Sequence, residues 1–236
     1  MPVAACMSAE TQPIKIDIWS DIACPWCYIG KRKFEAGSGL FIAAGDGRGV
    51  EIEYHSYELS PDTPVDFQGN EAEFLASHKG IPAAQAQELL DRVTGIAASV
   101  GLDYDYDHLQ HTNTVLGHEA IHFAKAQGRQ LDFMERLFKA YFIEGRHVGK
   151  VDELAALGAE IGLDADALTK ALEAHEHLAD VREDQQTALE YGIQGVPFFV
   201  IDGKYGVSGA QEAQTFAQVL EQVWEERTAA PEEVSA

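Results

Sequence analysis

The amino-acid sequence predicts an α/β fold in which a long helical block interrupts a smaller mixed unit. The chain opens with a strand–helix–strand pattern and closes with two short strands and a helix, whereas residues from about 70 to 190 have apolar side chains at helical spacing. With 236 residues, of which 46% are hydrophobic, the chain is long enough to bury a substantial core.

The first part of the chain has the pattern of a βαβ unit. Residues 14–19 (IKIDIW) alternate in polarity and are rich in β-branched side chains, which predicts a strand. The segment that follows Ser20 and Asp21, CPWCYIGKRKFEAG, reads as a helix, and residues 50–57 (VEIEYHSY) read as a second strand. A strand, a helix and a strand in this order indicate a parallel strand pair with a crossover helix.

Helices dominate the middle of the chain. Residues 58–69 contain prolines and show no clear period, so we expect a loop there. The residues beyond it are rich in Ala, Leu and Glu, with Asp164 placed as the N-cap of a helix over 165–174. One amphipathic helical face is Leu89, Leu90, Val93, Ile96, Ala97 and Val100.

The last part of the chain returns to β-structure. The strand FFVI ends at Asp202-Gly203, and an Asp-Gly pair between two β segments predicts a type I′ hairpin turn. Residues 211–227 then have the pattern of a final amphipathic helix.

Charge excludes several classes of partner. The net charge is −22, and such a surface repels phosphate backbones and anionic lipid headgroups, so we expect neither a nucleic-acid nor a membrane partner. No apolar run reaches the roughly 18 residues of a membrane-spanning helix. The first residues lack the basic and apolar regions of a signal peptide, which favours a cytoplasmic location.

Cys24 and Cys27 form a CxxC pair directly after the first strand, at the start of the first helix. This context is typical of a redox dithiol, because helix N-terminal N–H groups favour a thiolate. We expect Cys24 to sit exposed in the first turn, to have the lower pKa and to attack first, with Cys27 resolving the mixed disulfide. Pro25 suits the first helical turn, and Trp26 is placed to shape the substrate face.

Other uses of these residues compete with redox chemistry. A structural zinc site normally has four ligands, and no second CxxC follows, so we expect no metal. Two ordinary buried cysteines are a further alternative. Residues 118–122 read HEAIH, a formal HExxH zinc motif with Glu144 available as a third ligand, but its extended continuation is missing. We interpret His118 and His122 as two histidines on one helix face.

Two stretches, IWSDIACPWCYIGKRKFE and GIQGVPFFVIDGKYGVSGAQ, together resemble the DsbA-like branch of the thioredoxin superfamily and, within it, the FrnE-type cytoplasmic members. The resemblance implies a thioredoxin fold with a large all-helical insertion. The expected division is a thioredoxin-like domain in two halves (14–60 and 186–228), an inserted helical domain (61–185) and flexible termini (1–13 and 229–236).

The resemblance also implies site residues. Pro197 corresponds to the cis-proline that faces the CxxC, and the backbone of Val196 to the edge that pairs with substrate. Within the insertion, Asn113, Thr114 and His118 match an Asn-Ser/Thr pair followed by a helical His. The chain departs from the family pattern at two places. The chain has no cysteine after Cys27, which excludes a relay dithiol, and Pro-Trp stands where classical periplasmic relatives often carry a His.

The leading hypothesis is therefore dithiol–disulfide exchange on protein or small-molecule substrates, carried by Cys24 and Cys27 without a metal or organic cofactor. Pro25, Trp26, Val196 and Pro197 are the candidate substrate-binding residues. The alternative is a glutathione-dependent isomerase or transferase of the hydroxychromene-carboxylate isomerase or kappa-class type, which typically has Ser at the Cys24 position. A third possibility is a chaperone that uses the helical cap.

Two further residues near the motif or at the N-terminus have expected roles. Asp21 is a candidate helix cap or proton acceptor, and Cys6 is a bystander thiol.

Overall fold

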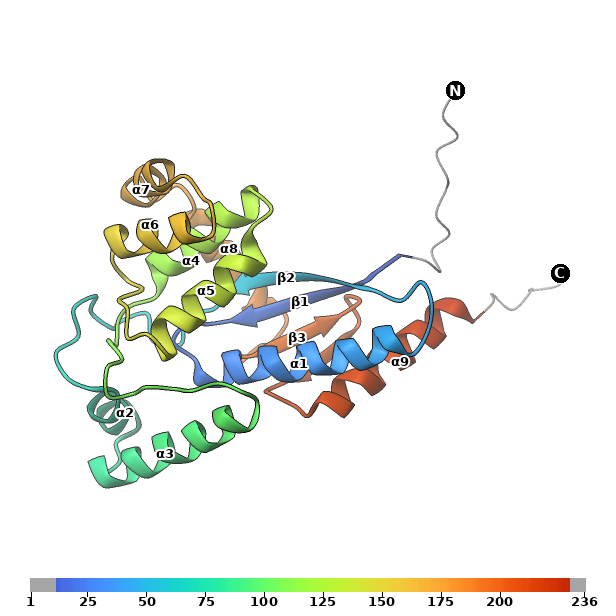
Figure 1. Cartoon of the computed structure of the whole chain (residues 1–236), viewed down its shortest axis with the longest axis horizontal. Coiled ribbons are helices and arrows are strands. Elements are labelled where there is room, and N and C mark those ends of the chain that lie inside the picture. Colours follow the sequence, from blue (N-terminus) through green and yellow to red (C-terminus); the bar gives the residue numbers. More distant parts are fainter. Residues whose placement is uncertain (1–11, 230–236) are drawn as a thin grey trace.

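A four-stranded mixed sheet organises the chain in the computed structural model, which describes residues 12–229 (Figure 1). The predicted flexible termini, and Cys6 with them, fall almost entirely outside these residues. In chain order the elements are β1 (Ile14–Ser20), α1 (Pro25–Ala43), β2 (Val50–Ser56), α2 (Glu71–Lys79), α3 (Ala83–Ser99), α4 (Val115–Ala126), α5 (Gln130–Phe142), α6 (Val151–Glu160), α7 (Ala165–Glu173), α8 (Leu178–Glu190), β3 (Phe198–Ile201), β4 (Tyr205–Ser208) and α9 (Ala213–Thr228).

Strand β1 lies inside the sheet, whose order is β2-β1-β3-β4. It pairs in parallel with β2, Ile14 opposite Val50, as the βαβ pattern predicts. On its other edge it pairs antiparallel with β3, Trp19 opposite Phe198. The opening and closing parts of the sequence therefore build one sheet, and the predicted α/β class with a helical insertion is confirmed.

Helices cover both faces of this sheet. Helices α1 and α9 pack against each other along one face, where Phe34, Phe199 and Phe216 meet with ring centroids 4.7–5.4 Å apart and each is at most 1% exposed. Helix α8 packs on the opposite face, against β2 and the side chain of Trp19. The side chains of the two central strands, β1 and β3, thus lie mostly in buried layers on both faces, which explains why these strands are the most apolar of the sheet.

The hairpin that joins β3 to β4 follows the sequence prediction in its turn. Asp202 and Gly203 both have positive φ, 58° and 64°, as a type I′ turn requires, and the Lys204 N–H donates to the Ile201 carbonyl at 3.1 Å. Ile201 pairs with Tyr205 across the two strands, so three residues, 202–204, connect them. This loop is one residue longer than the two central residues of the turn.

The insertion between β2 and β3 is helical within the described residues, as predicted. Helices α4, α5, α6 and α7 pack together at one end of the sheet, while α2 and α3 form a pair near the beginning of α1 (Figure 1). Asp164 caps α7, its side chain accepting from the Ala167 N–H at 2.9 Å. Helix α8 runs without a break across residue 185, the predicted domain border, and the division into domains stays a prediction.

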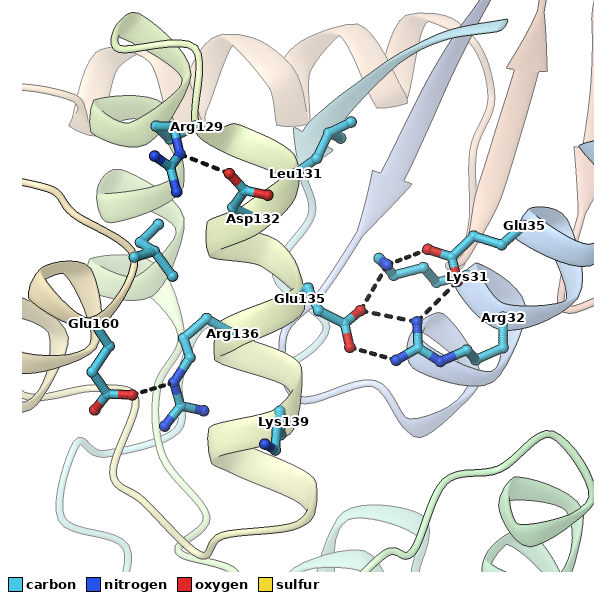
Figure 2. A pocket seen from close by; sticks show the side chains of 11 residues that line it. Lys31, Arg32, Glu35, Arg129, Leu131, Asp132, Glu135, Arg136, Lys139 and Glu160 are labelled. Atoms are coloured by element: carbon cyan, nitrogen blue, oxygen red, sulfur yellow. Dashed lines mark hydrogen bonds and ion pairs between the residues drawn. The ribbon is translucent and has the colours of Figure 1, made fainter. Parts of the chain in front are cut away.

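A cluster of charges fastens the insertion to α1 (Figure 2). Glu135 of α5 lies 2.7 Å from Lys31 Nζ, is paired with both guanidinium nitrogens of Arg32 and accepts from Tyr28 Oη at 2.8 Å. Burial opposes ionisation of Glu135, but Arg32 and Lys31 outweigh it and lower its pKa to about 2. This carboxylate therefore stays charged and holds α5 against α1 at neutral pH.

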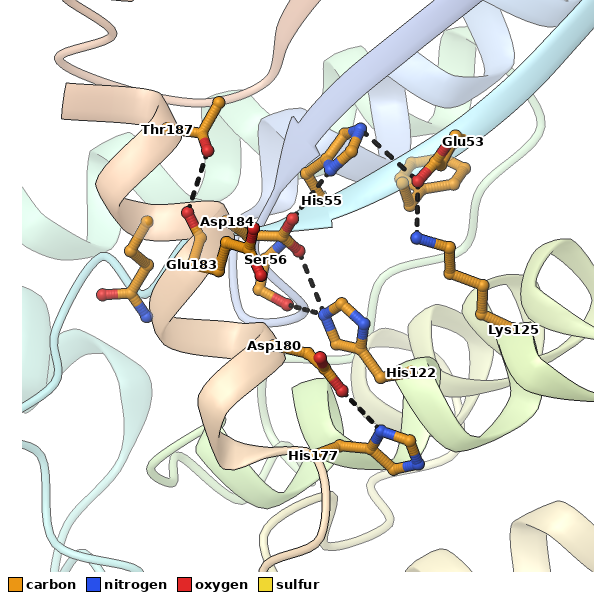
Figure 3. Close-up of polar contacts among 12 residues, drawn as sticks. Glu53, His55, Ser56, His122, Lys125, His177, Asp180, Glu183, Asp184 and Thr187 are labelled. Atoms are coloured by element: carbon orange, nitrogen blue, oxygen red, sulfur yellow. Dashed lines mark hydrogen bonds and ion pairs between the residues drawn. The ribbon is translucent and has the colours of Figure 1, made fainter. Parts of the chain in front are cut away.

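A second polar network fastens α8 to the far edge of the sheet (Figure 3). His55 of β2 lies between two carboxylates, with Nε2 2.8 Å from Asp17 Oδ1 and Nδ1 2.8 Å from Asp184 Oδ1. The other oxygen of Asp184 accepts from the Ser56 N–H at 2.8 Å and lies 3.0 Å from His122 Nε2. Burial disfavours a charged imidazole, but the two aspartates outweigh it and raise the pKa of His55 to about 9.

This network predicts a pH-dependent stability. Because the pKa of His55 is raised from 6.5 to about 9, its contribution to the free energy of unfolding is fully present below pH 6.5 and is lost as pH rises through about 9. The contribution is about 3 kcal/mol at 1.36 kcal/mol per pKa unit. Urea unfolding of wild type and His55→Gln across this range should give curves that converge at high pH. Parallel curves would contradict the assignment, and His108→Gln, at an exposed histidine, is the control.

Close packing of α1 against α9 predicts a position where a single methyl group destabilises the fold. A Cβ at Gly37 would lie 2.5 Å from the Ala213 carbonyl oxygen and 2.7 Å from Phe216 Cβ. We expect Gly37→Ala to lower the free energy of unfolding by about 1–3 kcal/mol in thermal or urea denaturation. Gly39→Ala, two residues along the same helix with nothing within 4 Å, should instead be neutral or stabilising. Equal effects of the two changes would refute the packing argument.

Candidate active site

The CxxC motif occupies the junction between β1 and α1, as predicted. Cys24 is the N-cap of α1 with extended backbone (φ −87°, ψ 112°), and Pro25 stands at the first helical position. The Cys27 N–H donates to the Cys24 carbonyl at 3.0 Å, which begins the first turn. Both cysteines are free thiols in the structure. The sequence therefore places one sulfur before the helix and the other within it.

Cys24 is not exposed, which corrects the sequence prediction. It is 3% exposed and Cys27 2%, because the segment before β3 and the insertion cover them. The Sγ atom of Cys24 donates to the Val196 carbonyl oxygen at 3.6 Å, and Tyr104, between α3 and α4, donates its hydroxyl to the Pro25 carbonyl at 2.7 Å. Reagents must therefore reach Cys24 through a cavity.

The segment that contacts Cys24 contains the predicted proline. The Val196–Pro197 peptide bond is cis in the structure. Pro197 lies directly over α1, because a Cβ built at Gly30 would come within 2.9 Å of Pro197 Cγ. Gly30 thus permits the close approach that brings Val196 to the sulfur of Cys24.

A cavity of about 680 Å³ opens beside Cys24, between the motif and the helices α2 and α3. It brings together four of the six predicted site residues, and the two others, Cys27 and Pro197, lie behind them. Trp26 is the most exposed member of the motif, at 39%. The residues of the motif and of the segment before β3 that line the cavity are Asp21, Ala23, Cys24, Pro25, Trp26, Gly195 and Val196.

The two thiols have unequal surroundings. Burial raises the pKa of the Cys27 thiol well above its usual value, and the neighbouring Cys24 raises it further, while Ser20 acts in the opposite direction. Cys27 is therefore a protonated thiol at neutral pH. Cys27 does not line the cavity, whereas Cys24 does.

Asp21 is fully buried behind the motif, and it does not cap α1 as the sequence suggested. Its Oδ1 accepts from the Ala23 N–H at 3.3 Å, and its Oδ2 accepts from the Leu59 N–H at 2.8 Å. His118 Nε2 lies 3.3 Å from Oδ1. Burial raises the pKa of Asp21, but the contact with His118, together with the Leu59 N–H and the Thr114 side chain, outweighs burial and lowers it. Asp21 thus fixes the loop that leads into Cys24.

The residues carried over from the family resemblance divide into two groups. His118 contacts Asp21, and Thr114 also hydrogen-bonds to this carboxylate and lines the cavity. Asn113 turns away: its Oδ1 accepts from the Val115 N–H at 2.9 Å at the start of α4, and its amide donates to the Pro61 carbonyl. Asn113 therefore has a capping role.

The side chains of the HExxH pattern do not converge on one point. His118 contacts Asp21 on one side of α4, whereas His122 contacts Ser56 and Asp184 (Figure 3). Glu119 is paired with His175 Nδ1 at 2.9 Å. Each of the three residues has a partner of its own, which agrees with their interpretation as helix-face residues.

One group of candidate metal ligands occurs among residues 12–229, and it contains neither cysteine. Atoms of Asp17, Glu53 and His55 lie within 4.8 Å of one another. Lys15 contacts both carboxylates, at 3.0 and 3.3 Å, and Lys125 also binds Glu53. These acids already have cationic partners.

No helix in the described part of the chain is a candidate for spanning a membrane. Across residues 12–229, every helix is too short or too polar to traverse a bilayer.

Comparison with known proteins identifies the family of the chain. A family model described as the DSBA-like thioredoxin domain matches residues 15–221. The chain belongs to this family. Its members are disulfide oxidoreductases and isomerases that act on thiol or disulfide substrates. The predicted thioredoxin fold with a helical insertion is confirmed, while the FrnE subtype stays a prediction.

Individual relatives span nearly the whole chain. The Bacillus subtilis protein YwbO, which is uncharacterized, is 28% identical over 214 residues, covering 88% of this chain and 96% of YwbO. The crystal structure of a probable DsbA oxidoreductase from Streptomyces coelicolor is 37% identical, covers 92% of this chain and 93% of that one, and has a TM-score of 0.83. A 2-hydroxychromene-2-carboxylate isomerase, 16% identical with a TM-score of 0.68 and covering 90% and 97%, shares the fold.

Sequence reasoning missed the residues that the insertion contributes. Tyr104, His111, Lys79 and Arg92 lie far from the motif in sequence and carry no local pattern. His111 lines the cavity, paired with Glu71 at 2.8 Å and stacked on Phe74. No spacing could have indicated these contacts, because they depend on how the helices pack.

The unequal surroundings of the thiols predict selective alkylation. Iodoacetamide added to the reduced protein at neutral pH should modify Cys24 and leave Cys27, since each unit by which the pKa of Cys27 is raised lowers its thiolate fraction about tenfold. Tandem mass spectrometry assigns the modified cysteine, and denatured protein, in which both react, is the control. Comparable rates at the two cysteines in the native protein would be incompatible with the structure.

Proposed function

We propose that this protein is a FrnE-type thiol–disulfide oxidoreductase that exchanges disulfides through Cys24 and Cys27. One observation carries the proposal: Cys24 lines the cavity, and its Sγ atom lies 3.6 Å from the carbonyl oxygen of Val196, which lines the same cavity. The DSBA-like family and the identity of 37% to a probable DsbA oxidoreductase support it. A cytoplasmic location is a further part of the proposal and rests on the sequence.

The proposed reaction has two exchange steps. The Cys24 thiolate attacks one sulfur of a substrate disulfide, forms a mixed disulfide and releases the other substrate sulfur as a thiolate, which takes up a proton. Cys27 then loses its proton and attacks Sγ of Cys24, which releases the second substrate thiol. The substrate gains two electrons and the protein pair becomes a disulfide. Oxidation of a substrate dithiol is the same sequence in reverse.

The neighbouring residues have proposed roles in binding. Trp26 and Pro25 present an apolar surface at the cavity wall, and Val196, which precedes Pro197, also lines the cavity. A substrate sulfur that approaches Cys24 would replace the contact between its Sγ and the Val196 carbonyl. The reduced Cys24–Cys27 dithiol supplies the two electrons and the oxidised disulfide accepts them in the reverse reaction, so the proposed chemistry requires no organic cofactor or metal.

A redox titration tests the proposal. In a glutathione buffer, wild type should pass through a reversible two-electron transition, followed by Trp26 fluorescence and by the mass of trapped thiols. Cys24→Ser should abolish reaction with substrate disulfides, and Cys27→Ser should accumulate the mixed disulfide, because no second thiol resolves it. Native protein alkylated at Cys24 is the control and should show no transition.

Two outcomes would reject the proposal. One is the absence of a transition in wild type. The other is a glutathione-dependent isomerase activity that Cys27→Ser leaves unchanged, which would favour the isomerase or transferase alternative. Protection of unfolded clients that survives Cys24→Ser would indicate the chaperone role.

A further inference from the structure

The positive charges of this acidic protein are almost all neutralised by neighbours. Among residues 12–229, which include every Lys and Arg of the chain, all but three of these side chains have a carboxylate oxygen within 4.0 Å. The three exceptions are Lys79, Arg92 and Lys170. In a chain of net charge −22, cations without a carboxylate within 4.0 Å are the exception.

Two of these three cations line the cavity of Cys24. Lys79 is the last residue of α2 and Arg92 lies in α3, so the two helices place them on the cavity wall that faces the CxxC motif. Both side chains are exposed at the rim. Lys170, in α7, is outside the cavity.

The carboxylates that line the cavity contact other residues and not these two cations. Asp21 and Glu71 are its two acidic lining residues, and each is buried against an imidazole, at 3.3 Å for His118 and 2.8 Å for His111. His78, the remaining ionisable lining residue apart from Cys24, stacks on Phe74. Lys79 and Arg92 are thus available to a ligand.

The rest of the cavity is apolar and of small-molecule size. Its volume of about 680 Å³ falls in the usual range for small-ligand sites. The cavity combines an apolar wall with Cys24 and with the cations Lys79 and Arg92. Such a site suits a compact molecule with a central disulfide and carboxylates at its ends. The apolar wall comprises Phe74, Leu75, Leu89, Leu90, Val93 and Leu59.

We infer that this cavity selects low-molecular-weight disulfides that carry carboxylates, with Lys79 and Arg92 as its specificity-determining residues. The inference rests on the proposed function. The carboxylates bind at the rim while the Cys24 thiolate attacks one sulfur; the S–S bond breaks, a carboxylate-bearing thiolate leaves, and Cys27 releases the second one by closing the protein disulfide. Each product thiolate takes up a proton, and the reduced protein supplies both electrons.

Single-turnover kinetics with three symmetric disulfides test this inference. Dithiodipropionate carries two carboxylates, hydroxyethyl disulfide is neutral and cystamine carries two ammonium groups. Each disulfide is mixed with reduced protein at low salt, and the second-order rate constant is measured. This constant is divided by the rate constant of the same disulfide with dithiothreitol, which corrects for differences in the intrinsic reactivity of the three disulfides. We expect the corrected rates to fall in the order given, and the preference for dithiodipropionate over the neutral compound to weaken with added salt.

The variants then assign the preference to residues. In the double variant Lys79→Gln/Arg92→Gln, the ratio of the dithiodipropionate rate to the neutral rate should fall about tenfold, the lower end of electrostatic steering effects. Lys170→Gln removes an equally unpaired charge outside the cavity and should leave the ratio at the wild-type value. Circular dichroism establishes that both variants are folded.

Each outcome decides between the two proposals. An unchanged ratio in the double variant, or an equal fall in Lys170→Gln, overturns the charge selection while disulfide exchange stands. No reaction with any of the three compounds refutes the proposed function itself. An acidic peptide disulfide is measured as a fourth compound. A preference for it without one for dithiodipropionate would overturn the small-molecule assignment and indicate a protein segment as substrate.

Discussion

The antiparallel pairing of β1 with β3 is the contact on which the site depends. It joins residues that are separated by the entire helical insertion, with Trp19 opposite Phe198 at the end of β1 that leads into the CxxC motif. Cys24 therefore follows β1 at the place where Val196 precedes β3. Because Gly30 lets the proline segment approach α1, this register brings the Val196 carbonyl to the sulfur of Cys24.

The insertion is held against this sheet by charges on two sides, and its placement creates the cavity. Glu135 binds cations of α1 on one side, and Asp184 binds His55 on the other (Figures 2 and 3). Separating one partner of such a buried or half-buried pair leaves a charge without its counterion, so each pair favours one arrangement of the helices. That arrangement covers Cys24 and leaves access to it through the space beside α2 and α3.

Local sequence patterns are sufficient to predict the helices and strands around the site and the position of the CxxC motif. The alternation in 14–19, the CPWC sequence and the Asp-Gly turn each reflect the physics of a few consecutive residues, and the structure has the strand, the helix start and the turn there. The burial of Cys24, the loop-fixing role of Asp21 and the unpaired state of Lys79 depend instead on contacts between distant segments. Such contacts leave no periodicity in a single sequence, which is why the exposure of Cys24 was wrongly predicted.

The burial of the two cysteines bears on the order of their reactions more directly than the helix N-terminus does. Cys27 is enclosed, its pKa is raised and its sulfur has no access to the cavity, so a substrate cannot meet it first. A mixed disulfide at Cys24, however, puts an electrophilic sulfur next to Cys27, one turn away within the same helix. In the proposed exchange, the sequence order of the motif thus becomes a reaction order, because Cys24 lines the cavity and Cys27 does not.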